Sequence, residues 1–333
     1  MARKLSQQQN RRINSKFEKT LIGSTASKEA VDSALGPEQS GLVISHHGHT
    51  IYVEAPDGRH FHCHVRRNLG SIVVGDRVIW QAQTEANEAC GVIIAKEPRR
   101  SLLIRASQYK PAQELAANID QVMVVLSLFP TPIPYFLDQH LVAAELQNIP
   151  CRIVMNKLDL QAEHPAPEWL EYYKSIGYPI IYASTKTQDG LAELNAEMQG
   201  KISILVGQSG VGKSSLINAL IDGSEAKTGS ISELNKKGRH TTAASCLYHM
   251  QNGGSIIDSP GVREFGISET RADKIIDGFI EIKSYLGQCK YRNCSHQNEA
   301  AADCAILSAV AAGNIAATRI HSLNRILDEL KAK

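Results

Sequence analysis

The sequence predicts a multidomain protein with three folded parts: an N-terminal β-barrel of the OB type, a central α/β domain with a phosphate-binding loop, and a mostly helical C-terminal domain that binds zinc. Three observations predict this: short alternating apolar runs before residue 98, longer apolar runs separated by helical segments from residue 118, and a cysteine/histidine cluster between 289 and 304. The length of 333 residues suits two or three domains of about 150 residues.

Residues 1–36 are expected to form a flexible basic arm, because they are polar and aperiodic. The first 20 residues contain six basic side chains and one acidic side chain, Glu18, although the net charge of the whole chain is only +2. Such a tail either reaches nucleic acid or merely keeps the chain in solution.

No apolar run approaches the ~20 residues that cross a bilayer, and the N-terminus lacks the apolar core of a signal peptide. We therefore expect a cytoplasmic monomer that does not associate with membranes. In a reducing compartment, the seven cysteines are expected to form no disulfides.

Residues 37–98 predict the barrel, because turn signals separate five short apolar runs. The expected antiparallel strands lie at 41–45, 50–55, 60–65, 76–82 and 91–97. The barrel is also rich in histidine, and its side chains either bind a second metal or face solvent or RNA: His46, His47, His49, His60, His62 and His64. Residues 99–117 are predicted to be a linker.

Residues 118–266 predict the central α/β domain, since their apolar runs are typical of buried parallel strands. These strands are expected at 120–128, 151–157, 179–184, 201–207 and 254–261, with helices near 135–148, 165–176 and 213–221. Residues 267–333 form the predicted C-terminal domain. Its last helix carries an apolar stripe that either packs in the core or meets a partner: Ile320, Leu323, Leu327 and Leu330.

A phosphate-binding loop follows the strand at 201–207 and leads into a helix. Its glycines let backbone N–H groups converge on phosphate oxygens, Lys213 supplies charge to the β and γ phosphates, and the Ser214 hydroxyl binds Mg²⁺. The predicted nucleotide-binding residues here are Gly207, Gln208, Ser209, Gly210, Val211, Gly212, Lys213, Ser214 and Ser215.

The segment Asp258-Ser-Pro-Gly261 ends the last predicted strand of the central domain. Alone it would be an ordinary turn. Together with the phosphate loop it predicts that Asp258 holds the nucleotide-bound Mg²⁺ and that the Gly261 N–H senses the γ-phosphate.

The tetrapeptide Asn156-Lys157-Leu158-Asp159 follows another strand and predicts guanine recognition. A carboxylate at Asp159 accepts hydrogen bonds from N1–H and N2–H₂ of guanine, a donor pair that adenine lacks. Asn156 braces neighbouring loops, and the stem of Lys157 covers the base. Ser184 is the expected second base contact.

These motifs occur in an unusual order, because the guanine motif precedes the phosphate loop and Asp258 follows both. Strands of a parallel sheet can be rejoined in another order where the old termini were close together. The order therefore predicts a circularly permuted GTPase. The Asp258 segment then runs directly into the C-terminal domain, so we expect nucleotide state to set the position of that domain.

Val262 occupies the position at which Ras-like GTPases carry the glutamine that orients the attacking water. The nearest substitute is the segment Gly238-Arg239-His240-Thr241-Thr242. His240 either orients the water or is an inert loop histidine. Thr241 or Thr242 completes the Mg²⁺ shell, and Thr242 is the preferred candidate.

Three thiols and one imidazole near the C-terminus form a sufficient ligand set for tetrahedral Zn²⁺: Cys289, Cys294, His296 and Cys304. Four protein ligands leave no place for a reactive water, so the zinc would be structural. The alternative is a set of free thiols.

The joint order of these motifs resembles the RsgA family (also called YjeQ or YloQ) of circularly permuted GTPases, over nearly the whole chain. The resemblance implies GTP hydrolysis stimulated by the small ribosomal subunit, a role in late maturation of that subunit, and contact of the barrel and zinc domain with its rRNA. It also implies that His240 is catalytic. The interval between His296 and Cys304 is longer than is usual in the family.

Two other classes of protein remain as alternatives to this enzyme. One is a nucleotide-gated RNA-binding module in which hydrolysis is incidental. The other is a metabolite-linked ATPase, which Asp159 disfavours.

Overall fold

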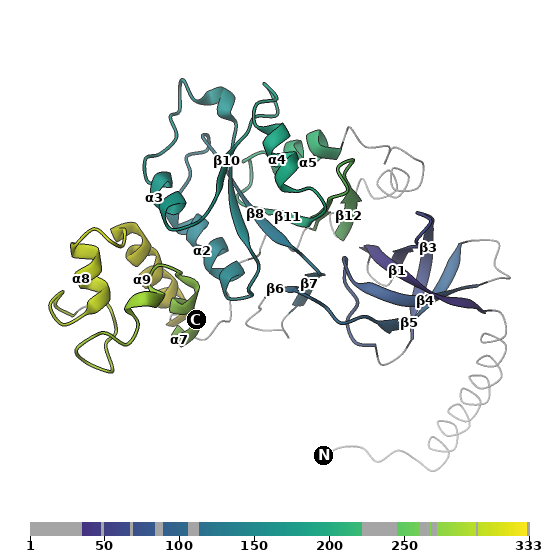
Figure 1. Ribbon diagram of the computed structural model, residues 1–333, viewed down its shortest axis with the longest axis horizontal. Coiled ribbons are helices and arrows are strands. Elements are labelled where there is room, and N and C mark those ends of the chain that lie inside the picture. Colours follow the sequence, from purple (N-terminus) through teal and green to yellow (C-terminus); the bar gives the residue numbers. More distant parts are fainter. Residues whose placement is uncertain are drawn as a thin grey trace, which may run out of the picture.

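The computed structural model describes residues 35–47, 50–66, 69–83, 89–105, 113–221, 245–259, 265, 267, 272–297 and 299–331. The central α/β domain lies between the barrel on one side and the C-terminal helices on the other (Figure 1). Most of the predicted basic arm lies outside the described residues.

The N-terminal part is a closed five-stranded barrel, as predicted. Its strands pair in the order β1-β2-β3-β5-β4, and β4 closes the barrel on β1. One expectation was wrong: β3 and β5 are parallel rather than antiparallel, because the chain crosses between them through β4. The strands are β1 (Leu35–His47), β2 (Thr50–Glu54), β3 (His60–Val65), β4 (Arg77–Gln83) and β5 (Cys90–Lys96).

The segment predicted as a linker contains a two-stranded antiparallel sheet, β6 (Leu102–Arg105) and β7 (Gln113–Ala117). Arg99 ties this sheet to the barrel, because its guanidinium lies 2.7 Å from both Asp76 Oδ1 and Glu114 Oε2. Strands this short carry too little apolar periodicity to be recognised from sequence.

The central domain has five parallel strands in the order β10-β9-β8-β11-β13, as predicted. They are β8 (Gln121–Ser127), β9 (Cys151–Asn156), β10 (Ile180–Tyr182), β11 (Ile202–Val206) and β13 (Ser255–Asp258). The associated helices are α2 (Pro134–Glu145), α3 (Leu170–Ser175), α4 (Leu191–Glu197) and α5 (Lys213–Ile221), with the 3-10 turn η1 (Leu158–Leu160) after β9.

One further strand, β12 (Ser245–His249), joins the barrel to the central domain. It is antiparallel both to β13 and to β1, so the two sheets become one 11-stranded sheet. Strand β12 was not predicted from the sequence, because Leu247 is its only buried residue.

The C-terminal part is helical, as predicted, with α7 (Ala272–Ile275), η4 (Ile276–Gly278), η5 (Lys283–Tyr285), α8 (Ala305–Ala311) and α9 (Ala317–Lys331). The apolar stripe of α9 packs into a core with Phe279 and Ile306, which confirms the core interpretation. Among the described residues, no helix is long and apolar enough to cross a membrane.

A buried charge network fastens α9 to the central domain. The Arg319 guanidinium lies 2.5 Å from Asp138 Oδ1 on α2 and 2.6 Å from Glu281 Oε1, and it lies over the ring of Phe279. The Tyr173 hydroxyl donates to the same Asp138 oxygen at 2.6 Å. Burial opposes the charge of Arg319, but Asp138 and Glu281 outweigh this effect and raise its pKa well above the usual value.

The substitution Arg319→Ala should destabilise the folded chain by about 3–5 kcal/mol, because it leaves two buried carboxylates without their cation. Urea unfolding followed by circular dichroism measures this loss. The control Lys331→Ala removes an exposed ion pair from the same helix and should cost no more than about 1 kcal/mol. Equal effects of the two substitutions would contradict the assignment.

Candidate functional site

The predicted nucleotide-binding motifs meet at the carboxyl edge of the parallel sheet, where open α/β sheets usually bind their ligands. The phosphate loop leaves β11, the guanine motif begins at the last residue of β9, and Asp258 ends β13. Strands β9, β8, β11 and β13 are consecutive neighbours in the sheet. Motifs that are far apart in sequence therefore share one edge.

The phosphate loop has a backbone that only glycine adopts readily at several positions. Gly207, Gly210 and Gly212 have φ values of 138°, 82° and 93°. A Cβ at Gly207 would collide with the carbonyl oxygen of Val125, whereas a Cβ at Gly210 would meet open space. The Lys213 ammonium donates to the carbonyls of Gly207 and Gln208 at 2.7 and 2.5 Å, so it lies inside the curve of the loop.

Asn156 and Lys157 hold the guanine motif against the phosphate loop. The buried Asn156 Nδ2 donates to the Val211 carbonyl at 2.8 Å. The Lys157 ammonium donates to the carbonyls of Gly210 and Phe129 at 2.6 and 2.7 Å. Lys157 has a φ of 63°, a conformation that is uncommon outside glycine and is concentrated at functional sites.

Asp159 is oriented by neighbours from the loop after β10. The Ser184 hydroxyl donates to Asp159 Oδ1 at 2.7 Å, and the Lys186 ammonium lies 3.6 Å from Oδ2. The hydrogen bond from Ser184 lowers the pKa of Asp159, which favours an ionised carboxylate that can accept hydrogen bonds. Ser184 itself is fully buried, and its hydroxyl also accepts from the backbone N–H groups of Lys186 and Thr187 at 3.2 and 3.3 Å. Its role as a second base contact stays a prediction.

Asp258 lies between the phosphate-loop strand and the strand that joins the barrel. The preceding residue, Ile257, pairs with Ile204 of β11, and Asp258 itself pairs with Cys246 of β12. The next residue, Ser259, lies 2.6 Å from the Ser245 hydroxyl. Gly261, Val262, His240, Thr241 and Thr242 lie outside the described residues.

The oxygen atoms of Ser214 and Asp258 are of the kind that Mg²⁺ prefers. Ser214 is exposed in the first turn of α5, next to the loop lysine. Asp258 ends the strand adjacent to β11. Their chemistry and their placement at one sheet edge fit a nucleotide-bound magnesium ion.

The predicted zinc ligands form a compact cluster. The ligand atoms of Cys289, Cys294, His296 and Cys304 all lie within 4.8 Å of one another. His296 Nδ1 is 3.5 Å from the sulfurs of Cys289 and Cys304, which are 3.9 Å apart. Tetrahedral zinc with bonds of about 2.0–2.3 Å separates its ligand atoms by roughly 3.3–3.8 Å. The described spacings of 3.5 and 3.9 Å are close to this range, so the ligand set suits this ion.

The long interval before Cys304 is closed by hydrogen bonds within the loop. Glu299 accepts from the backbone N–H groups of Ser295 and Gln297 at 2.7 and 3.0 Å. These bonds lower the pKa of Glu299 to about 2. Cys304 then caps the N-terminus of α8, where its sulfur accepts from the Leu307 N–H at 3.5 Å, and a helix N-terminus favours a thiolate.

His49 and the side chain of His47 lie outside the described residues, and the described barrel histidines do not form a comparable cluster. Within the described part of the chain, the C-terminal group alone brings together three or more potential metal ligands. His62 instead lies between Tyr52 and His64, with ring centroids 5.8 and 5.0 Å away.

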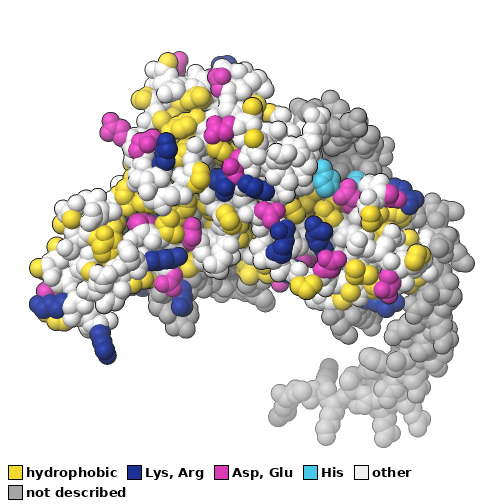
Figure 2. Space-filling view, viewed as in Figure 1, with side chains coloured by type: hydrophobic (Ala, Val, Ile, Leu, Met, Phe, Trp, Pro, Cys, Tyr) yellow, Lys and Arg dark blue, Asp and Glu magenta, His cyan; other side chains and the backbone are white. Residues whose placement is uncertain are grey.

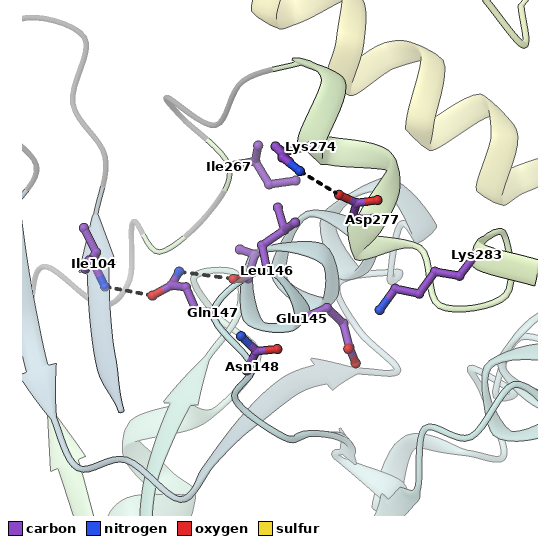
Figure 3. A pocket seen from close by; sticks show the side chains of 10 residues that line it. Ile104, Glu145, Leu146, Gln147, Asn148, Ile267, Lys274, Asp277 and Lys283 are labelled. Carbon is purple, nitrogen blue, oxygen red and sulfur yellow. Dashed lines mark hydrogen bonds and ion pairs between the residues drawn. The ribbon is translucent and has the colours of Figure 1, made fainter. Parts of the chain in front are cut away.

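A groove of about 480 Å³ lies where the end of α2 meets β6 and α7 (Figure 3). Gln147 crosses part of it, because its side chain accepts from the Ile104 N–H and donates to the Ala143 carbonyl. Helix α2 leads from the carboxyl end of β8 to the amino end of β9, so this groove lies at the edge opposite the phosphate loop. It is not part of the candidate nucleotide site.

Comparison with known proteins agrees with this geometry. Residues 96–268 match the sequence model of the RsgA GTPase family, which covers more than half of the chain. The chain belongs to the RsgA family. As a member of this family it is a GTP hydrolase, and its reversed motif order is the circular permutation that the sequence predicted.

Two curated relatives and two solved structures illustrate the similarity. The small ribosomal subunit biogenesis GTPase RsgA of Klebsiella pneumoniae (strain 342) is 41% identical, over 98% of this chain and 95% of the relative. The RsgA of Pseudomonas putida F1 is 40% identical, over 97% of each chain. YjeQ from Thermotoga maritima has a TM-score of 0.68 at 30% identity, covering 89% of this chain and 100% of that one. YloQ, a circularly permuted GTPase, has a TM-score of 0.67 at 26% identity, covering 89% of this chain and 96% of that one.

Several residues that support this site were not predicted from the sequence. The Phe129 carbonyl binds Lys157 through backbone atoms, which leave no signal in a sequence. Lys186 pairs with Asp159, and its place two residues after Ser184 was a signal that could have been used. Ser245 contacts Ser259 from a strand that was not predicted.

Replacing Asp159 with Asn should weaken GTP binding by about 10–100-fold, because the amide mismatches the guanine donors. The same variant should bind xanthosine nucleotides better than the wild type does. Titration with fluorescent GTP, ATP and XTP analogues measures both effects. Asp189→Asn, a nearby exposed carboxylate bonded to Thr187, should leave the preference unchanged, and a retained preference for GTP in Asp159→Asn would contradict the assignment.

Proposed function

We propose that this GTPase binds the small ribosomal subunit in the cytoplasm, acts in its late maturation, and hydrolyses GTP to GDP and phosphate faster when the subunit is bound. The observation that carries the proposal is the pair of contacts from Asn156 and Lys157 to the phosphate loop. They join a guanine-selective element to a phosphate-binding element in the order typical of RsgA. The relatives named above are small ribosomal subunit biogenesis GTPases.

The nucleotide is held at two ends in this proposal. Asp159 accepts from the guanine ring, with Ser184 as its brace. The phosphate loop from Gly207 to Ser215 surrounds the phosphates, and the Gly261 N–H contacts the γ-phosphate. Ser214, Asp258 and Thr242 hold the Mg²⁺, which neutralises charge that develops on the phosphates.

His240 is the proposed catalytic residue, because Val262 has no group that can orient water. Its imidazole would accept a hydrogen bond from the attacking water once the segment around it closes on the nucleotide. Subunit binding would stabilise the closed position. This accounts for stimulation without any residue supplied to the site from outside the chain.

Contact with rRNA is proposed for the basic arm, the barrel and the zinc domain. The arm supplies positive charge to phosphates. The exposed His64 and the neighbouring His62 and Tyr52 rings on the barrel offer surfaces for stacking on bases.

Multiple-turnover GTPase measured with and without small subunits tests the proposal. We expect strong stimulation that declines as salt is raised, because phosphate contacts release counterions. The variant His240→Ala should retain GTP affinity within about twofold and lose stimulated turnover by about 10²–10⁴-fold. Binding to subunits without stimulation would instead favour the RNA-binding module with incidental hydrolysis.

The zinc domain is tested by removing the metal. We expect one zinc ion per chain, and Cys289→Ser should lower metal content and expose amides in residues 284–316 to hydrogen exchange, because a structural zinc contributes folding energy. Metal analysis and exchange mass spectrometry measure these effects. Cys151→Ser, a cysteine far from the cluster in sequence and buried in the central domain, serves as the control. A metal-free chain with unchanged protection would refute the site.

A further inference from the structure

The barrel connects to the Asp258 end of the nucleotide site through an unbroken run of backbone pairing. In strand β1, Ser45 pairs with Cys246 and His46 pairs with Ser245. Cys246 in turn pairs with Asp258 on the other side of β12. Only one strand therefore separates the barrel from the proposed magnesium ligand.

Side chains reinforce this connection on both sides of β12. The Ser45 hydroxyl lies 3.4 Å from the Cys246 sulfur, and the Ser245 hydroxyl lies 2.6 Å from that of Ser259. Ile44 of the barrel is 2% exposed and belongs to the same apolar core as Leu247 and Ile257. A shift of the barrel would thus move β12 against the end of β13.

An ion pair between the two domains closes the far end of β12. His249 Nε2 lies 2.7 Å from Glu54 Oε2 of the barrel, and Nδ1 lies 3.0 Å from the Ser255 hydroxyl of β13. His60 contributes a weaker contact, 3.6 Å from Glu54 Oε1. On the face drawn in Figure 2, histidine and acidic side chains adjoin where the barrel meets the central domain.

The pairing favours the charged form of both partners. Burial opposes ionisation of Glu54, but hydrogen bonds from His249 and His60 outweigh it and lower the pKa of Glu54 to about 2. The hydrogen bond to Glu54 raises the pKa of His249. An imidazolium donates from both nitrogens, so His249 can bond Glu54 and Ser255 together.

The two neighbours of the central domain are attached in different ways. Arg319 and Asp138, at the C-terminal interface, have fully buried side chains, and separating them would leave buried charges unpaired. The side chain of His249, at the barrel interface, is 44% exposed, so its pairing with Glu54 can open to water. The His249–Glu54 pair is therefore the more easily opened of these two ion pairs.

We propose that the docked barrel positions Asp258 for magnesium, with Glu54 and His249 as positioning residues, so that barrel docking and binding of Mg²⁺–nucleotide strengthen each other. This inference rests on the magnesium role of Asp258 in the proposed function. The coupling is reciprocal by thermodynamic necessity: whatever holds β12 in register favours the metal-bound state, and the metal-bound state favours docking.

The test compares affinity for a non-hydrolysable GTP analogue with Mg²⁺ and with EDTA, in the full-length chain. Glu54→Gln keeps the shape of the side chain and removes its charge. It should reduce the Mg²⁺-dependent gain in affinity by about fivefold or more, leave affinity in EDTA within about twofold, and speed hydrogen exchange in residues 245–249. His249→Gln should act in the same direction from the other side of the interface.

The matched control is Asp57→Asn, which removes another barrel carboxylate. Asp57 is 51% exposed and pairs with Arg59 of the same turn, so the Mg²⁺-dependent gain and the exchange of β12 should stay unchanged. Asp258→Asn should abolish the gain, and adding Glu54→Gln to it should have no further effect, because both act through one carboxylate.

Three results would overturn the inference. In the first, Glu54→Gln speeds hydrogen exchange in β12 without changing the Mg²⁺-dependent gain in affinity. In the second, neither the exchange nor the gain changes. In the third, binding weakens equally with Mg²⁺ and with EDTA, as a general loss of structure would cause. In each of these cases the proposed function still holds if Asp258→Asn abolishes the Mg²⁺-dependent gain in affinity. If Asp258→Asn itself keeps the gain, the proposed magnesium role fails, and the inference fails with it.

Discussion

The hydrogen bonds from Asn156 and Lys157 to the carbonyls of the phosphate loop are the contacts on which the rest of the site depends. They connect two segments that the chain visits in the reverse of the usual order. Because a parallel sheet places the carboxyl ends of all its strands at one edge, the order of visiting them does not change what meets there. A permuted chain can therefore build the same nucleotide site, provided that these contacts form.

Permutation changes what is attached to the site rather than the site itself. The segment after Asp258 leads to the C-terminal domain, which the buried Arg319 network fastens to α2. The strand before it, β12, pairs directly with the barrel. The β12–β13 pair is thus connected at both ends to domains outside the nucleotide fold. The C-terminal interface has the buried Arg319 network, and the barrel interface has the half-exposed His249. The expectation that nucleotide state sets the position of the C-terminal domain stays a prediction.

Much of the fold could be predicted because its signals are local. The barrel strands alternate, the central strands are continuously apolar, and the glycines of the phosphate loop occupy positions that need positive φ. Strand β12 and the sheet of β6 and β7 were missed, since their stability comes from partners distant in sequence rather than from their own patterns. The parallel pairing of β3 with β5 was missed for the same reason. The roles of His240 and Thr242 stay predictions.

The sequence by itself determined that this protein is a circularly permuted GTPase, and it predicted which side chains bind guanine, phosphate, magnesium and zinc, because those predictions depend on residue type and short spacing. Only the tertiary structure decided which of them stand together and what surrounds them. Despite the long loop before Cys304, the sulfur of this residue lies with the other predicted zinc ligands. Glu54 contacts His249, which lies 195 positions further along the chain. Contacts of this kind arise from how sheets join in three dimensions, and no local pattern encodes them.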